Sequence, residues 1–366
     1  MRIGLSAPIR RQLACGVADP SARPMRLVEV QREHGLLHDG IATHRARCSS
    51  VLARDLQAQH ESLAVGDWVL ACPDGHGAWR ITCRLLPQHQ ISRRTNDGQG
   101  GLQRQVLVSN VDTALLVMGL DGDFNLRRLE RYLALAHLSG LAGQGVVLLL
   151  SKADTLDAAL AAQRLAQAQA LLAPGMAALA LDLRQPAAAL ALMPWLQCGR
   201  TLVLLGSSGA GKSTLANTLV RAFSALVHPP GQRVTGAVRA GDSRGRHTTS
   251  VRTLLPLPGA ACIIDSPGLR ALRLDAGDAS QLADAFGDVA RWAPLCRFRD
   301  CQHRQEPGCA VRLAVPEPRL RNYHKLLREA GRDALNADER RAQLAQWKSR
   351  SRNAQIRLQA KRSAGA

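Results

Sequence analysis

The sequence predicts a multidomain protein with a small N-terminal β-barrel, a central α/β domain and a mostly helical C-terminal region. Three observations predict this division. Residues 27–91 consist of short strand-like runs broken by Gly, Pro, Asp and Asn, which is typical of small barrels. From Val106 onward apolar runs alternate with helical stretches, which indicates a parallel sheet covered on both faces. After about Asp275 the strand-like runs end, and a group of Cys and His residues precedes helical sequence.

The charge balance narrows the class of partner. The chain has 366 residues, with 48 Lys and Arg against 29 Asp and Glu, which gives a formal net charge of +19. Such an excess suggests a polyanionic partner, either nucleic acid or an anionic membrane surface; a generally basic proteome is the alternative. No apolar run approaches the ~20 residues that a membrane-spanning helix needs, so we expect no membrane insertion.

The N-terminal sequence shows no apolar core followed by a cleavage site, so we expect no secretory signal and a cytoplasmic location. Nine cysteines in such a chain are free thiols or metal ligands rather than a disulfide framework. The segment SRRTNDGQGG, residues 92–101, is expected to be a solvated basic loop. We expect an N-terminal extension without a readable role over residues 1–26, a barrel over 27–100, an α/β domain over 101–275 and a zinc-binding helical domain over 276–366.

The strongest motif is a glycine-rich loop between the apolar strand TLVLL and a helical stretch. It comprises Gly206, Ser207, Ser208, Gly209, Ala210, Gly211, Lys212 and Ser213, followed by Thr214. Glycines let backbone N–H groups converge on a phosphate chain, and the N-terminus of the next helix adds its positive end. In this motif the lysine, Lys212, reaches the β- and γ-phosphates, and the hydroxyl of Ser213 binds Mg²⁺.

A second motif, DSPG, runs from Asp265 to Gly268 directly after the apolar strand ACII. In phosphate-loop nucleotidases a carboxylate at such a strand end holds Mg²⁺ through water, and the glycine N–H senses the γ-phosphate. The tetrapeptide alone is also compatible with an ordinary turn. Its position, 52 residues after Ser213, favours a nucleotide-sensing switch.

A third motif, SKAD, comprises Ser151, Lys152, Ala153 and Asp154 and resembles the guanine-reading motif NKxD. Asp154 can accept hydrogen bonds from the ring N–H and the exocyclic amine of guanine, and the stem of Lys152 can cover the base. Adenine would leave the carboxylate unpaired, which carries a large penalty. Ser151 stands where Asn is usual, so we expect the loss of an amide that contacts the base and braces neighbouring loops.

The order of these motifs is informative. SKAD precedes the glycine-rich loop by about 50 residues, whereas an ordinary G domain places the phosphate loop first. The motifs can still meet, because parallel strands present their carboxyl ends at one edge of the sheet whatever their order of connection. The sequence therefore predicts a circularly permuted P-loop G domain.

Four residues in the C-terminal region have the spacing C-x4-C-x-H-x5-C: Cys296, Cys301, His303 and Cys309. Three thiolates and one imidazole suit tetrahedral Zn²⁺, and four protein ligands leave no open position, so we expect one structural zinc ion. The other cysteines are interpreted as buried small hydrophobic residues. They are Cys15, Cys48, Cys72, Cys83, Cys198 and Cys262.

Together these motifs resemble the RsgA (YjeQ) family of circularly permuted GTPases, which assist assembly of the small ribosomal subunit. Three further segments support the resemblance: VGDW at residues 65–68, SNVD at 109–112 and GRHTT at 245–249. The resemblance implies an OB-type barrel, a central GTPase that binds Mg²⁺ with GTP, and a zinc-bearing C-terminal domain. It also implies that Thr248 or Thr249 completes the coordination of Mg²⁺.

The residue that orients the attacking water is less evident. Leu269 follows DSPG where many GTPases place a glutamine, and an apolar side chain cannot orient water. His247 is the local candidate, because a neutral imidazole accepts a proton or aligns water. A solvated loop histidine, or one that binds RNA phosphate, is the alternative. No base-supporting signature is legible in residues 179–190, and no residue is assigned there.

We therefore expect a monomeric GTPase that binds the small ribosomal subunit in its GTP state and leaves when rRNA contacts have promoted hydrolysis to GDP. RNA contact is expected from the barrel, from the basic segment with Arg93 and Arg94, and from residues 340–366, which hold eight Lys or Arg and no acidic residue. One alternative is a GTPase that acts on another RNA or on the large subunit. Another is a GTP-gated RNA-binding module with little turnover.

Overall fold

The computed structural model describes most of the chain, in two compact units. The described residues are 3–15, 19–31, 34–75, 77–96, 102–141, 143–227, 252–259, 261–265 and 279–334. One unit comprises residues 1–93 and 105–272, and the other comprises residues 94–104 and 273–366. Among the described residues, no helix has the length and apolarity to cross a membrane.

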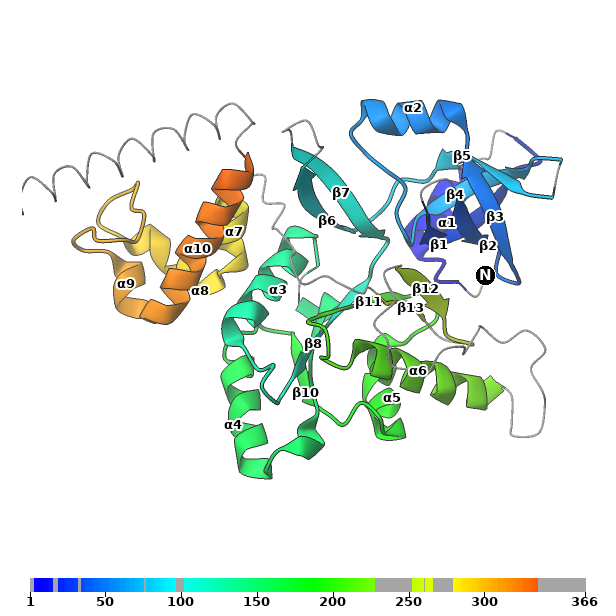
Figure 1. Cartoon of the computed structure of the whole chain (residues 1–366). Coiled ribbons are helices and arrows are strands. Elements are labelled where there is room, and N and C mark those ends of the chain that lie inside the picture. Colours follow the sequence, from blue (N-terminus) through cyan, green and yellow to red (C-terminus); the bar gives the residue numbers. More distant parts are fainter. Residues whose placement is uncertain are drawn as a thin grey trace, which may run out of the picture. The chain divides into compact units, whose positions relative to one another are not determined.

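The N-terminal part of the first unit is a closed five-stranded barrel, which confirms the predicted OB-type architecture (Figure 1). Helix α1 (Ala7–Ala14) precedes it, and α2 (Ser50–Ala58) begins where the Ser49 side chain accepts a hydrogen bond from the Leu52 N–H. In the order β1-β2-β3-β5-β4, the strands are β1 (Arg23–Val30), β2 (Gly35–His38), β3 (Thr43–Cys48), β5 (Trp79–Arg84) and β4 (Trp68–Pro73). Alternate side chains fill the barrel, among them Met25, Leu27, Leu37, Val69, Ala71 and Ile81.

A two-stranded sheet follows the barrel, formed by β6 (Gln90–Asn96) and β7 (Leu102–Ser109). The prediction of a solvated loop over residues 92–101 was wrong for residues 92–96, which are strand. Polar side chains pair across the two strands here, since Arg93 Nε donates to Gln105 Oε1 at 2.9 Å. The turn-forming Asn and Gly residues gather only toward the end of that segment, so they indicate the turn and not the strand before it.

The α/β domain contains a six-stranded sheet in the order β10-β9-β8-β11-β13-β12. In that order the strands are β10 (Ala177–Ala180), β9 (Val146–Ser151), β8 (Thr113–Gly119), β11 (Thr201–Gly206), β13 (Cys262–Asp265) and β12 (Thr253–Pro256). All neighbours are parallel except β12, which is antiparallel to β13. Every residue of β8, β9 and β11 is buried, as their continuous apolar runs predict.

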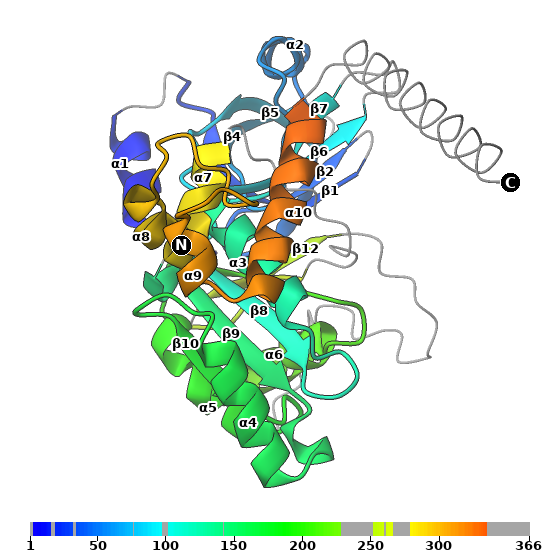
Figure 2. The same cartoon turned by 90° about the vertical axis from the view of Figure 1, so that its left-hand side faces the viewer.

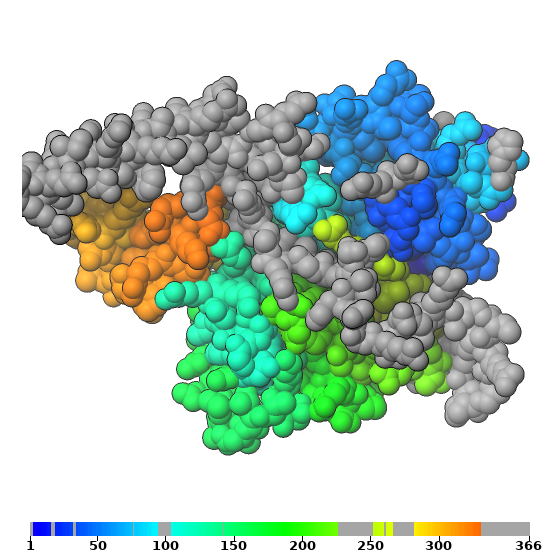
Figure 3. All heavy atoms as spheres, in the orientation of Figure 1, coloured from blue at the N-terminus to red at the C-terminus, as the bar shows by residue number. Residues whose placement is uncertain are grey.

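Helices cover both faces of this sheet. Helices α3 (Leu126–Leu138) and α4 (Ala158–Gln169) lie on one face, and α5 (Pro186–Leu192) and α6 (Lys212–Val227) lie on the other (Figure 2). Figure 3 shows the layer of α3 and α4 at the left side of the α/β domain. The core beneath α5 and α6 includes Leu115, Val117, Leu149, Leu192, Leu204, Leu215, Leu219 and Phe223.

The connection of the strands confirms the circular permutation. Strand β11 leads into the glycine-rich loop and lies between β8 and β13, while β9, which leads into SKAD, comes earlier in the chain. Because β9, β11 and β13 are parallel, their carboxyl ends share one edge of the sheet. All three sequence motifs therefore start at this edge.

The second unit is mostly helical, as predicted. Its elements are α7 (Ala279–Ala285), α8 (Gly287–Trp292), the 3₁₀ turn η5 (Ala293–Leu295), α9 (Ala310–Ala314) and α10 (Glu317–Ala334). Phe286 meets Tyr323 of α10 edge to face, with ring centroids 5.3 Å apart. The described core of this unit is small, with Leu282, Val289, Val311, Leu320 and Leu326 among its buried residues.

The burial of the remaining cysteines corrects one expectation. Of the six outside the zinc motif, only Cys262 is buried; Cys15, Cys83 and Cys198 are exposed, and Cys48 and Cys72 are half-buried. Side chains alternate along a strand, so Cys72 lies on the outward side next to the core residue Ala71. Cys83 follows the core residue Ile81 by two positions and is exposed because the pairing of β4 with β5 shifts register between Leu70 and Ala71.

Candidate functional site

The glycine-rich loop connects the end of β11 to the start of α6. At Gly206 a Cβ atom would lie 2.2 Å from the carbonyl oxygen of Val117, so no larger residue fits. Gly211 has a φ of 99°, in the left-handed region that favours glycine. The buried Lys212 ammonium donates to the carbonyl oxygens of Gly206 at 2.9 Å and Ser207 at 2.6 Å. Its charge therefore lies inside the loop, where a phosphate chain would meet it.

The hydroxyl of Ser213 and the carboxylate of Asp265 meet at the mouth of this loop. Ser213 Oγ donates to Asp265 Oδ2 at 3.2 Å. The other oxygen, Asp265 Oδ1, is buried and has no hydrogen-bond partner among the described residues. Oxygen ligands and water are what Mg²⁺ prefers, and a buried carboxylate oxygen needs such a partner. These two residues therefore fit a nucleotide-bound Mg²⁺.

SKAD follows β9 and is tied directly to the phosphate loop. Ser151 is buried, and its hydroxyl donates to the Ala210 carbonyl at 2.6 Å. The amide that is usual at this position is absent, and the shorter serine side chain supplies one link between the two loops in its place. The 3₁₀ turn η2 (Ala153–Thr155) then carries Asp154 at the surface.

An acidic loop after β8 supports both motifs. Lys152 Nζ lies 2.7 Å from Asp121 Oδ2, and this hydrogen bond holds the pKa of Asp121 below its ordinary value. Ser207 Oγ donates to Asp123 Oδ2 at 2.6 Å. The sequence analysis assigned neither aspartate. The available signal was the segment DGD placed directly after a buried strand, at the same sheet edge as the other motifs.

The segment after β10, to which no residue was assigned, supplies two charged groups beside Asp154. Arg184 Nη2 lies 2.7 Å from Asp154 Oδ2. The same guanidinium pairs with Asp182, whose oxygens lie 2.9 Å from Nε and 3.1 Å from Nη2. The hydrogen bond from Arg184 lowers the pKa of Asp182 to about 2. Between the two, Leu183 is buried against Gly211 of the phosphate loop.

This sheet edge thus combines a phosphate loop with a buried ammonium, a pair of oxygen ligands and a surface carboxylate braced by neighbouring loops. Ser208 and Thr214 are exposed on the phosphate loop and the start of α6. Four other predicted residues lie outside the described part of the chain: His247, Thr248, Thr249 and Gly268.

The four predicted zinc ligands form a second cluster. Their ligand atoms all lie within 4.8 Å of one another. Cys296 Sγ is 3.8 Å from Cys309 Sγ and 3.6 Å from His303 Nδ1, and Cys309 Sγ is 3.5 Å from the same nitrogen. Tetrahedral zinc, with Zn–S of about 2.3 Å and Zn–N of about 2.0 Å, places sulfurs about 3.8 Å apart and sulfur and nitrogen about 3.5 Å apart. These donors fit Zn²⁺.

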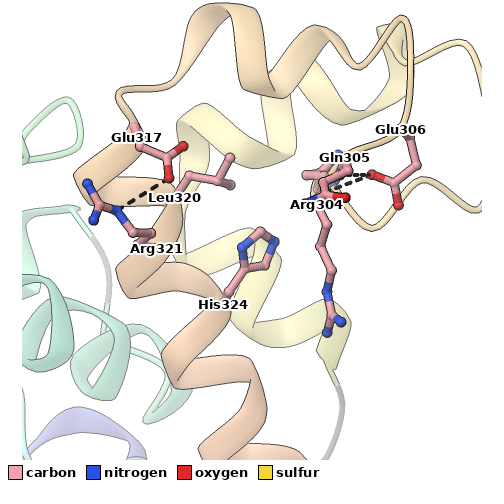
Figure 4. A pocket seen from close by; sticks show the side chains of 8 residues that line it. Arg304, Gln305, Glu306, Glu317, Leu320, Arg321 and His324 are labelled. Atoms are coloured by element: carbon pink, nitrogen blue, oxygen red, sulfur yellow. Dashed lines mark hydrogen bonds and ion pairs between the residues drawn. The ribbon is translucent and has the colours of Figure 1, made fainter. Parts of the chain in front are cut away.

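The loop that carries Cys301 and His303 is shaped by Glu306. Its carboxylate accepts hydrogen bonds from the backbone N–H groups of Gln302 at 3.1 Å, Arg304 at 2.7 Å and Gln305 at 3.0 Å. Beside this loop a hollow of about 650 Å³ opens toward α10, where Glu317 pairs with Arg321 (Figure 4). The sequence analysis did not single out Glu306, because a lone glutamate among ligands carries no signal of its own.

The segments VGDW and SNVD meet where the barrel adjoins the α/β domain. Arg26 is fully buried there, and its guanidinium donates to the carbonyl oxygens of Gly66 and Asn110 at 3.2 and 3.3 Å. Asp67 is also fully buried, and its Oδ2 accepts the N–H of Ala64 at 2.8 Å. Burial raises the pKa of Asp67 to about 7. These residues join two parts of one unit rather than line the nucleotide edge.

Comparison with known proteins identifies relatives over most of the chain. Residues 85–275 match the family model described as RsgA GTPase. The small ribosomal subunit biogenesis GTPase RsgA of Xanthomonas campestris pv. campestris is 43% identical over 333 residues, covering 89% of this chain and 86% of the relative. The protein of the same name from Xylella fastidiosa is 42% identical over 330 residues, covering 86% of this chain and 87% of the relative.

Two solved structures share the fold. The crystal structure of YjeQ from Thermotoga maritima matches with a TM-score of 0.58 and 22% identity, covering 84% of this chain and 98% of that one. YloQ, a circularly permuted GTPase, matches with a TM-score of 0.56 and 19% identity, covering 86% and 97%. At these identities the likeness concerns the fold.

Proposed function

The chain belongs to the RsgA GTPase family, and from this premise we propose that it binds the small ribosomal subunit, assists its late maturation and leaves once GTP is hydrolysed. One observation carries the proposal: the phosphate loop, the Ser213–Asp265 pair and Asp154 converge at one sheet edge. Two relatives that match most of this chain are named for small-subunit biogenesis.

Within this proposal the nucleotide is held by groups of three kinds. The backbone of residues 206–213 and the ammonium of Lys212 bind the phosphates, while Ser213 and Asp265 hold Mg²⁺, the latter through water. Asp154 accepts hydrogen bonds from guanine, and the stem of Lys152 covers the base. Adenine presents the opposite pattern of donors and acceptors, so the same carboxylate rejects ATP.

Hydrolysis requires a group that orients water, and Leu269 cannot supply it. We assign this role to His247, whose imidazole can accept a proton near neutral pH, and the completion of Mg²⁺ coordination to Thr248 or Thr249. Gly268 supplies an N–H that senses the γ-phosphate. Contact between these residues and rRNA promotes hydrolysis, so that bound subunits accelerate the reaction.

The remaining domains bind the RNA. The proposal keeps the predicted divisions at residues 100 and 275 and begins the barrel at Arg23, where β1 starts, with a structural zinc ion held by the four-residue cluster in the last domain. Residues 266–278 connect Asp265 to α7, so a displacement at the nucleotide switch has a short covalent route to the zinc domain. A protein with this function works in the cytoplasm. It works as a monomer, because one copy of the chain contains every group named here.

Phosphate recognition should dominate the contact with rRNA, because only 3% of the residues are aromatic and base stacking needs aromatic side chains. The basic residues of the β6–β7 hairpin, Arg93 and Arg94, and the basic residues 340–366 supply the positive charge. Affinity for small subunits should therefore fall steeply as salt concentration rises.

The deciding experiment measures GTP hydrolysis by the zinc-loaded protein alone, with small subunits and with large subunits, using ATP as the control nucleotide. Strong stimulation by small subunits alone is the expected result. Stimulation by large subunits instead would show that the large subunit is the partner. Absence of stimulation by either subunit would overturn the proposed partner and favour a GTP-gated RNA-binding module. In the same assay, His247→Ala should lower the stimulated rate without weakening GDP binding.

A further inference from the structure

We infer that Arg184 is a specificity-determining residue, which donates a hydrogen bond to O6 of guanine while Asp154 reads the neighbouring N–H groups. The inference rests on the proposed binding of guanine at Asp154. It assigns a role to the segment after β10, where the sequence shows no base-supporting signature.

The chemistry of guanine requires such a partner. The edge of the base that faces Asp154 presents two kinds of group: N1–H and the 2-amino group donate, whereas O6 accepts. An ionised carboxylate only accepts hydrogen bonds, so Asp154 can read the donors and leaves O6 to another group. Arginine is the side chain that most often donates to the acceptors of guanine in nucleic-acid complexes.

The geometry places a guanidinium at the required position. Arg184 Nη2 is 2.7 Å from Asp154 Oδ2. A carboxylate oxygen has two lone pairs, so Oδ2 can keep this bond and also accept N1–H of guanine. N1 is bonded to the carbon that carries O6. A guanidinium bound to the oxygen that takes N1–H therefore lies on the O6 side of the base. The two N–H groups of Nη2 donate to Asp154 and Asp182, so the group that donates to O6 is Nη1.

Asp182 holds the guanidinium in place for this contact. Its two oxygens pair with Nε and Nη2 of Arg184, and Oδ1 also accepts the backbone N–H of Arg184 at 3.0 Å. The Arg184 side chain is 65% exposed, whereas that of Asp182 is 17% exposed. The cation is thus anchored from the protein side and accessible from the side that a base would approach. A planar donor that is already oriented loses little conformational freedom on binding.

The test compares affinities for GDP and 6-thio-GDP in the full-length, zinc-loaded protein, measured by calorimetry for the wild type and Arg184→Ala. In 6-thio-GDP a sulfur, which is a weak acceptor, replaces O6, while N1–H and the 2-amino group remain. We expect Arg184→Ala to weaken GDP binding about tenfold, which is the effect of losing a hydrogen bond from a charged donor. The same substitution should weaken 6-thio-GDP binding by about twofold or less, because the sulfur accepts only a weak hydrogen bond from Arg184.

A matched control is Arg221→Ala, which removes an exposed arginine of α6 and should leave both affinities unchanged. The inference is overturned if Arg184→Ala binds GDP as tightly as the wild type, if it binds GDP more tightly because Arg184 competes with the base, or if both nucleotides weaken equally. A wild-type protein that binds ADP as well as GDP would instead overturn the proposed reading of guanine, and this inference with it.

Discussion

The nucleotide edge and the zinc cluster are both built from polar side chains, but the chain assembles them in different ways. The zinc ligands lie within one segment, from Cys296 to Cys309. The residues of the nucleotide edge come from five loops spread between Asp121 and Asp265, each following a strand of the same sheet. One site depends on donors that are close in sequence, and the other depends on the order of the strands.

The surroundings of the two sites differ in the same way. The nucleotide edge rests on β8, β9 and β11, in which every residue is buried, so the sheet positions its loops without a ligand. The zinc region has short helices and a small described core. A metal ion bound at the cluster would contribute much of the stability of a region with so little buried apolar surface.

Removal of zinc tests this difference with the largest expected effect. A structural zinc site contributes about 10–16 kcal/mol of binding free energy, so chelation should unfold much of residues 279–334 while GDP affinity changes by less than about twofold, because the sheet does not depend on zinc. Hydrogen exchange with mass spectrometry reports the first effect, and calorimetry the second. Cys301→Ser should behave like the chelated protein, and Cys83→Ser, at an exposed cysteine outside the cluster, should not. Collapse of GDP binding on chelation would refute the independence of the two regions.

Asp154→Asn tests whether a single carboxylate sets base choice at the nucleotide edge. The NH₂ group of asparagine can donate a hydrogen bond to O2 of xanthine. In guanine it would face the 2-amino group, which is also a donor, so GDP affinity should fall about 100-fold and XDP affinity should rise. The matched control is Asp157→Asn, because Asp157 caps α4 through the N–H groups of Ala159 and Leu160 and asparagine caps equally well. Unchanged preference for GDP in the Asp154 variant would place the base elsewhere.

Asp67→Asn tests how far a buried group outside the nucleotide edge controls the stability of the larger unit. Burial raises the pKa of Asp67 to about 7, so the folded state binds a proton more tightly than the unfolded state. Its stabilising contribution is complete below about pH 4 and is lost as pH rises through about 7. The wild type should lose on the order of 4 kcal/mol of unfolding free energy over that range relative to the variant. Denaturant unfolding at several pH values measures it, and parallel pH profiles would contradict it.

The smallest expected effect concerns the bracing of the phosphate loop. Ser207→Ala removes the hydrogen bond from Ser207 Oγ to Asp123 Oδ2 and should weaken GDP binding by about fivefold. Asp123→Ala removes that bond and also the acceptor of the Gly119 N–H, so it should weaken GDP binding at least as much. The double variant should be little worse than Asp123→Ala alone, because the bond between Ser207 and Asp123 is already absent there. Ser208→Ala, on an exposed side chain of the same loop, is the control. Fully additive losses would show that the two residues act separately.

Much of the fold was predictable because its signals are local. Continuous apolar runs identified β8, β9 and β11, and the order of SKAD and the glycine-rich loop identified the permutation. Local patterns also gave two wrong predictions. Polar strand residues 92–96 look like a loop, and cysteines on the outward side of barrel strands look like core residues, because composition does not reveal which way a side chain faces.

The sequence by itself determined which chemical groups the protein carries: a glycine-rich phosphate loop, a carboxylate in a segment that resembles NKxD, and three Cys and one His at fixed spacing. These are properties of short segments, so they are legible without a fold. Only the tertiary structure decided that Ser151 braces the phosphate loop, that Asp121 and Asp123 support it, and that Arg184 lies beside Asp154. Those pairs join residues far apart in the chain, and the order of strands in the sheet alone brings them within hydrogen-bonding distance.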